Sequence, residues 1–311
     1  MPVLSPEQMK TYLVDAFSRN TPAYLSGPYH LLASFETFNR DGTPNGEGSI
    51  EKYFAAPGRV KVTTRFGSGS MTTYYVRDQV LYTNSGFDGT IMTYFANEFL
   101  LDFLPPPQGI IGRKLETSSV GVGDATVNCG TFQFYLEPPR SPYPSAPKEM
   151  FCVSNATHDL VLRRTLAFTI EYKGFAPFLG RSIAREIVAS EDGVVRCRIH
   201  IAQLDEAKLD DSALTPPPSA SPLSPGPEWR STSAAELTPK RGATGTSGVP
   251  VTGLALISST GTVKDYEPLY APSPEIAARV AGAVKHWKYA PIVRQGEPVE
   301  TILSIHVLFG S

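Results

Sequence analysis

The chain has 311 residues, of which 41% are hydrophobic and 19% charged, and its formal net charge is −2. This composition supports a globular core and excludes wholesale disorder. The weak negative charge argues against a nucleic-acid-binding protein, which usually carries a basic face. Abundant Pro (28) and Gly (26) disfavour a helical bundle and predict many turns between strands.

No run of roughly 18 apolar residues occurs, so we expect no transmembrane segment. The N-terminal stretch MPVLSPEQMK lacks the basic and apolar regions of a signal peptide. Either the protein is cytoplasmic, or a leader is missing from this sequence.

The segment LSPEQMKTYLVDAF predicts the first helix. Ser5 is a suitable N-cap, and Gln8 stands at the position that completes a capping box. Apolar residues then recur every four positions on one face: Met9, Leu13 and Phe17.

Runs with alternating apolar and polar residues follow from about residue 28 to residue 205, separated by turn signals such as RDGTPNGEG and GSGS. A period of two is typical of strands with one buried face. We therefore predict a mainly β fold: a curved antiparallel sheet, or half-barrel, with covering helices, in which each strand pairs with the next.

The segment GTIMTYFANEFLLDFLPPPQ interrupts this pattern and predicts a short helix that ends at the prolines. Apolar residues cover most of its circumference, so it must be buried on several sides. It either plugs the concave face of the sheet or forms a lid over an apolar cavity. The second interpretation predicts these ligand-binding residues: Ile91, Met92, Phe95, Phe99, Leu101 and Phe103.

Cys129 and Cys152 lie on strands that are predicted to be neighbours. A disulfide between them would close a loop of about 24 residues, stabilise the fold by roughly 3 kcal/mol and fit an oxidising compartment. The alternative is two buried thiols, and Cys197 reads as a small core residue. No cysteine or histidine spacing indicates a metal site.

After Leu209 the composition shifts to LTPPPSASPLSPGPEW, which predicts a proline-rich linker over residues 210–248. A smaller α+β domain follows from Val249. Its pattern is strand, strand, helix, strand, and Ser273 is a suitable N-cap for the helix SPEIAARVAGAVKHWKY.

Residues 249–311 resemble the TonB C-terminal domain in three stretches: TGLALISSTGTVKDYEPLYAPS, AGAVKHWKYAP and GEPVETILSIHVLF. The motif residues are Trp287, Tyr289, Pro291, Gly296, Pro298 and Phe309. The resemblance implies that a partner adds a strand to the edge of the last strand. It predicts these partner-binding residues: Glu300, Ile302, Ser304, His306 and Leu308. The family's N-terminal membrane helix is missing, so we do not expect energy transduction.

Residues 5–205 resemble the LolA/LolB-like lipoprotein-carrier fold. The resemblance rests on the opening helix, on FETFNRDGTPNGEGSIEKYFAAPGRVKVTTRF as consecutive hairpins, and on the apolar helix before LPPP. It implies an unclosed barrel covered by helices, with an apolar cavity for acyl chains.

These features predict three regions: a LolA-like β domain (1–209), a linker (210–248) and a TonB C-terminal-like domain (249–311). The leading hypothesis is a non-enzymatic periplasmic protein of the cell envelope. Its C-terminal domain would bind an envelope protein, such as an outer-membrane receptor or a transporter component. The alternative is a carrier of a lipid, an acyl chain or a lipoprotein. No catalytic motif was found, so we predict no catalytic residue and no cofactor. An open cavity would favour the carrier, and a filled concave face would favour a scaffold.

Overall fold

The computed structural model describes residues 3–21, 27–77, 79–101, 114–133, 148–165, 167–209, 211–222, 228–229, 249–294 and 297–309. The chain forms two compact units. The N-terminal unit comprises Met1–Asp78, Asn84–Asp88 and Met92–Thr215, and the C-terminal unit comprises Gln79–Thr83, Gly89–Ile91 and Pro216–Ser311.

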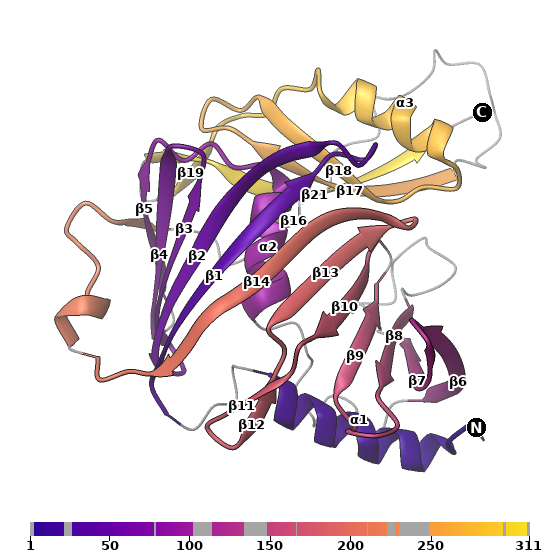
Figure 1. The fold of residues 1–311 in the computed structure, drawn as a ribbon. Helices are drawn as coiled ribbons and strands as arrows, with labels where there is room; N and C mark the ends of the chain where they lie inside the picture. The colour runs from indigo at the N-terminus through magenta and orange to yellow at the C-terminus, as the bar shows by residue number, and fades with distance from the viewer. Residues whose placement is uncertain are drawn as a thin grey trace. The chain divides into compact units, whose positions relative to one another are not determined.

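The N-terminal unit is built on an antiparallel sheet with the strand order β4-β3-β2-β1-β14-β13-β10-β9-β8-β7-β6. Figure 1 shows this sheet bending around helix α2 (Ile91–Leu101). The predicted curved antiparallel sheet with covering helices is therefore confirmed. The strands are β1 (Tyr29–Phe38), β2 (Pro44–Ala56), β3 (Arg59–Phe66), β4 (Gly69–Val76), β6 (Leu115–Val122), β7 (Ala125–Gln133), β8 (Lys148–Val153), β9 (Leu160–Arg164), β10 (Thr169–Lys173), β13 (Glu186–Glu191) and β14 (Val194–Glu206). A separate hairpin joins β11 (Ala176–Phe178) to β12 (Arg181–Ile183).

The sheet departs from the predicted order at its centre. β1 pairs with β2 on one side and with β14 on the other, in a register that sets Tyr29 opposite Glu206. The expectation that each strand pairs with the next holds for β1 and β2, but it did not include the pair of β1 with β14. Alternation along a strand reports which face is buried, but it does not report which distant strand lies alongside.

Directly opposed residues of antiparallel strands point to the same side of a sheet, so the registers define one continuous inner face. On one part of this inner face, helix α2 packs against buried side chains that include Tyr29 and Phe35 of β1. The α2 residues in this contact are Met92, Ala96, Phe99 and Leu100. The other part of the face, formed by β6, β7, β8 and β9, is covered by helix α1 (Pro6–Asn20).

Helix α1 is fixed at both ends. The predicted capping box is confirmed: the Ser5 hydroxyl accepts from the Gln8 N–H, and the Ser5 N–H donates to the Gln8 side chain. At the other end, Asn20 Nδ2 donates to Asp159 Oδ1 at 2.9 Å and to the Ser182 carbonyl at 2.7 Å. Buried residues of α1 include Met9, Leu13, Ala16 and Phe17.

Gly130 of β7 lets α1 approach the sheet closely. A Cβ atom at this position would lie 2.9 Å from Leu13 Cδ1, 3.2 Å from Met9 Cγ and 2.7 Å from Leu115 Cδ1. The absence of a side chain at residue 130 therefore sets the depth at which the helix packs.

The C-terminal unit contains β17 (Val249–Ile257), β18 (Val263–Tyr270), helix α3 (Pro274–Val284), the hairpin β19 (Ile292–Arg294) and β20 (Glu297–Val299), and β21 (Thr301–Phe309). The sheet order is β16-β21-β17-β18, where β16 (Glu228–Trp229) runs parallel to β21. The strand–strand–helix–strand pattern read from the sequence is thus observed. Ser273 caps α3 as expected, accepting a hydrogen bond from the Ile276 N–H at 3.4 Å.

Helix α3 ends at Val284, which is earlier than the sequence predicted. Trp287 lies beyond the helix, partly buried, and packs against the core formed by α3 and the sheet. It therefore flanks this core instead of filling its centre. Pro291 and Pro298 are exposed, and Gly296 lies outside the described residues.

The proline-rich stretch is not a plain spacer where the structure describes it. The boundary between the units falls after Thr215. Residues Asp211–Leu214 form a 3₁₀ turn (η3) in which Leu214 is buried, and β15 (Ser221–Pro222) pairs with Leu81 and Tyr82 of β5 (Gln79–Ser85). The composition of the stretch did not predict this ordered turn, because a single buried leucine is enough to anchor it. Among the helices in the described ranges, none has both the length and the apolar character needed to cross a bilayer.

Candidate functional site

The predicted ligand-binding residues on α2 have different environments. Ile91, Met92 and Phe99 are buried, and the last two belong to the core beneath the helix. Phe95 is partly exposed. Leu101 ends the helix, and Phe103 lies outside the described residues. The helix therefore plugs one part of the inner face. Among the predicted residues whose side chains the structure describes, Phe95 is the one that solvent still reaches.

An aromatic cluster lies under this side of α2. Phe95 and Phe99 stack with ring centroids 5.7 Å apart. Phe168, from the turn between β9 and β10, meets both rings edge-on at 5.1 and 5.5 Å. Such edge-to-face contacts are favourable for aromatic rings. They form an apolar wall that is buried at Phe168 and partly open at Phe95.

A buried arginine stands beside this wall on the same inner face. Arg163 of β9 is opposite Phe151 on β8 and Ile170 on β10, and it is only 8% exposed. Its Nε and Nη2 donate to one oxygen of Glu149, at 3.1 and 2.8 Å. Its guanidinium also lies over the Phe151 ring, 5.6 Å from the centroid. A buried charge requires such a partner, because leaving it unpaired would cost several kcal/mol.

Tyr172 of β10 adds a phenol to the same region. It packs against the core under α2 and also against the core under α1, so it lies where the two covered parts of the inner face meet. Burial raises the pKa of Tyr172 to about 12, although the charge of Arg163 and its hydrogen bond to the phenol act in the opposite direction. The residue nevertheless keeps part of its surface accessible to solvent.

Glu98 is the single charged residue of α2. It is exposed, yet the surrounding protein raises the pKa of its carboxyl, while the charge of Arg163 lowers it. Within the described ranges, its carboxylate has neither a hydrogen bond nor an ion pair. On the inner face itself, we call Phe95, Glu149, Arg163 and Tyr172 the inner cluster.

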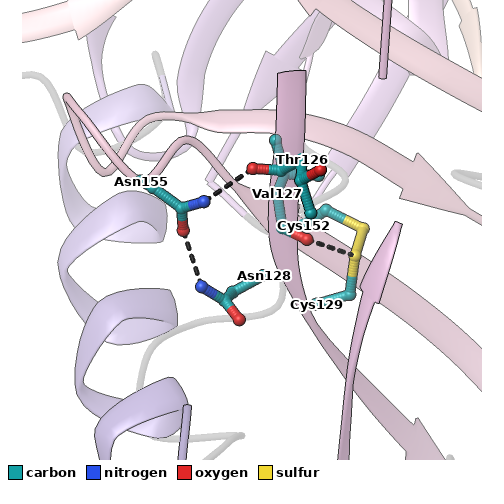
Figure 2. The surroundings of a disulfide bond; sticks show 6 residues. All are labelled: Thr126, Val127, Asn128, Cys129, Cys152 and Asn155. Carbon is teal, nitrogen blue, oxygen red and sulfur yellow. Dashed lines mark hydrogen bonds between the residues drawn. A yellow bond between two sulfur atoms is a disulfide. The ribbon is translucent and has the colours of Figure 1, made fainter. Parts of the chain in front are cut away.

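The opposite face of the sheet carries the disulfide. Cys129 and Cys152 are directly opposed on β7 and β8, both fully buried, and they form the predicted disulfide (Figure 2). The alternative of two free thiols is wrong. Figure 2 also shows the Asn155 side chain, which donates to the Thr126 carbonyl and accepts from Asn128 Nδ2, both at 2.6 Å.

Cys197 is a buried free thiol on the inner face, opposite Thr37. Burial raises the pKa of this thiol to about 12. His200 pairs with Ser34 and points to the other side of the sheet. The two residues therefore form no nucleophile–base pair. Within the described residues there is also no group of three or more His, Cys, Asp or Glu that could hold a metal ion.

The predicted partner-binding residues lie on or next to β21. Glu300 accepts from Lys264 Nζ at 2.7 Å, and Ile302 is partly buried. Ser304, His306 and Leu308 belong to the strand, which pairs with β17 along its length. Its other side was expected to be a free edge. Instead, β16 of the same chain pairs there with Leu303 and Ser304.

Sequence reasoning missed the polar part of the inner cluster. Glu149, Arg163 and Tyr172 come from three different strands, and none belongs to a motif.

Neither a protein-family model nor a curated protein matches this sequence. Among solved structures, a domain from Vibrio parahaemolyticus named for outer-membrane lipoprotein sorting is 11% identical, with a TM-score of 0.46 over 68% of this chain and 97% of that one. A DUF1329 family protein from Desulfovibrio piger is 12% identical, with a TM-score of 0.46 over 68% of this chain and 98% of that one. A LolA superfamily protein from Nitrosomonas europaea is 10% identical, with a TM-score of 0.40 over 67% of this chain and 97% of that one.

All three TM-scores are below 0.5, so these likenesses assign neither a family nor a function to the chain. The comparisons give no support to the TonB resemblance of residues 249–311.

Proposed function

We propose that this protein is a non-enzymatic carrier of a lipid or another acyl-chain ligand, and that the N-terminal unit holds the chain against the inner cluster. The observation that carries the proposal is the accessibility of Phe95 and Tyr172 on the inner side of a sheet whose other inner residues are largely buried. Solvent enters beside an aromatic wall, and apolar surface that is open to water favours an apolar ligand.

The α2 helix supports the same proposal. Its side chains fill the inner face by apolar contact, at Met92, Ala96, Phe99 and Leu100. Apolar contacts are non-directional, so an alkyl chain can replace part of them at little cost. Asn97 links α2 to Thr64 of β3 by hydrogen bonds at 2.7 and 3.1 Å, so any adjustment to a ligand would involve the apolar contacts of the helix.

The disulfide supports an extracytoplasmic location such as the periplasm, because such bonds persist in oxidising compartments. A ligand carrier of the cell envelope would need no catalytic group.

Native mass spectrometry of protein purified from the periplasm of a Gram-negative host, followed by organic extraction, tests the proposal. We expect a co-purifying lipid or lipoprotein fragment, and we expect Phe95→Asp to lose it. Tyr270→Asp is the matched control, because Tyr270 is a 44% exposed aromatic residue of the C-terminal unit. A ligand-free wild type that also binds no added C12 amphiphile would overturn the proposal.

One observation favours a second function for the C-terminal unit, namely protein binding through β21, as in a TonB-like domain. The parallel pairing of Glu228 and Trp229 occupies this edge only beside Leu303 and Ser304, and it supports the proposal that a partner strand pairs further along β21. A photo-crosslinking residue at His306 of the full chain should capture an envelope protein, and one at the exposed Glu275 of α3 should not. Equal capture at both sites, or none at His306, would reject this role.

A further inference from the structure

We propose that the hairpin of β11 and β12 is a flap that gates the inner face, and that Leu179 at its tip is the side chain that an entering alkyl chain displaces. The flap comprises residues 174–185, between β10 and β13. This inference rests on the carrier function proposed above and names the part of the chain that controls entry of the ligand.

The flap leaves the main sheet. Gly174, directly after β10, has φ +63°, a left-handed conformation that turns the chain out of the strand. β11 and β12 then pair with each other in a two-stranded sheet of their own. A hydrogen bond from the Arg185 N–H to the Lys173 carbonyl, at 3.0 Å, closes the base. A hairpin of two strands is only marginally stable by itself, so contacts with the rest of the N-terminal unit hold it in place.

The tip of the flap is a strained turn. Leu179 and Gly180 form its two-residue loop, with φ +47° and +74°. The hairpin of β13 and β14 has the same kind of loop at Asp192 and Gly193, with φ +48° and +83°. Asp and Gly are residues that such turns favour, whereas a bulky side chain at positive φ is unfavourable. A leucine at this position therefore indicates that its packing offsets the strain.

The strained leucine delivers an apolar side chain to the inner face. Leu179 and its neighbour Phe178 are half-buried and pack against the core under α2. The Phe178 ring meets the fully buried Tyr29 of β1 edge-on, with ring centroids 6.4 Å apart. The tip of the flap therefore covers apolar surface at the start of the first strand.

The flap lies between helix α1 and the inner cluster. The Ser182 carbonyl accepts a hydrogen bond from Asn20 at the end of α1, and Figure 1 shows the hairpin beside that end of the helix. Tyr172 of the inner cluster stands two residues before Gly174, on the strand that leads into the flap. Tyr172 packs against the same core as the tip of the flap and is partly accessible to solvent. Release of the tip would thus widen the apolar surface that is open beside the inner cluster.

Two opposed effects set the state of the flap. Burial of Leu179 favours the closed state, and relief of its backbone strain favours the open state. The opposition narrows the free-energy difference between the two states, which is the condition for a ligand to shift the balance. An alkyl chain makes the same non-directional contacts as the leucine, so it can take the place of the leucine on the core.

Stopped-flow binding of dansylated dodecanoic acid to the full chain tests the gate, with Leu179→Asn as the variant. Asn-Gly is the preferred sequence of such a turn, so the change should keep the hairpin while it removes the apolar tip. We expect the association rate to rise about tenfold, the equivalent of a half-buried leucine that no longer competes for the site. The dissociation rate should stay within about twofold, because the closed flap blocks entry and does not hold the ligand. Asp192→Asn is the matched control, since it makes the same Asn-Gly loop at an exposed turn with the same φ.

Hydrogen exchange of the wild type gives a second readout that needs no variant. The probe should speed exchange at residues 175–183 and leave the loop between β13 and β14 unchanged. The gate is wrong, and the carrier function stands, if the wild type binds the probe but any of three results is found. These are equal rates in Leu179→Asn and the wild type, a change in dissociation alone, or exchange in the hairpin that the probe does not alter. If the wild type does not bind the probe, the carrier function and the gate are both wrong.

Discussion

The disulfide gives the sharpest quantitative prediction. It joins residues 23 positions apart on neighbouring strands, and both sulfurs are buried. In the chain-entropy model, a cross-link that closes a loop of this length lowers the conformational entropy of the unfolded chain. This loss raises the free energy of unfolding by about 3 kcal/mol. We therefore expect reduction of Cys129–Cys152 to lower the free energy of unfolding of the N-terminal unit by about 3 kcal/mol. Because the bond is fully buried, reduction should be carried out in urea, and the reduced chain then refolded with reductant present.

The sequence supplies separate reporters for the two units. Both tryptophans, Trp229 and Trp287, belong to the C-terminal unit, so their fluorescence follows that unit alone. Far-UV circular dichroism is dominated by the long sheet of the N-terminal unit. In urea titrations, the dichroism midpoint should fall on reduction, and the fluorescence midpoint should stay in place. The Cys129→Ala/Cys152→Ala double variant should no longer respond to reductant.

Two results would refute this reasoning. If reduction lowered the free energy of unfolding by less than about 1 kcal/mol, the cross-link would have little effect on the entropy of the unfolded chain. A matching shift of the tryptophan signal would mean that the two units unfold together, so that they are not independent in stability.

Three further predictions concern single residues. Gly130→Ala should destabilise the N-terminal unit by about 1–3 kcal/mol, because its Cβ would press on Leu13 of α1; an unchanged dichroism midpoint would contradict the close packing. Gly261→Ala should destabilise the C-terminal unit, seen by tryptophan fluorescence, because residue 261 has φ +84° and its Cβ would lie 1.9 Å from the Tyr289 carbonyl oxygen. Tyr172 has a pKa raised to about 12 in the fold against 10.0 for the free group, so its contribution to stability is complete below pH 10 and is lost as the pH rises toward 12. Urea midpoints at pH 8 and pH 11 should therefore differ more in the wild type than in Tyr172→Phe, and equal differences would show that another group dominates.

Local sequence chemistry was enough to predict much of the fold. The capping box at Ser5 and Gln8 is written in a few adjacent residues, and strand alternation marks the buried face directly. The pairing of Cys129 with Cys152 followed from two neighbouring strands with a single connection between them. In each case the information lies within a few residues of the feature, or within one hairpin.

The features that could not be predicted depend on long-range register. Arg163 sits opposite Phe151 because β9 pairs with β8 through an irregular register near Cys152, which no local pattern encodes. The contacts of Phe95 and Phe99 with Phe168 need the position of α2 on the sheet. The early end of α3 reflects a turn at Lys285 and His286, although Lys285 is a good helix former.

The pairing of β1 with β14 has a consequence for the order of events during synthesis. The register that sets Tyr29 opposite Glu206 joins the first strand of the sheet to the last. The middle of the sheet therefore cannot close until nearly the whole N-terminal unit has left the ribosome or a translocation channel. Such non-local contacts slow folding. Until then β1 and β2 form a hairpin with one bare edge and an uncovered apolar face, the state in which the nascent chain would be most exposed to proteases and chaperones.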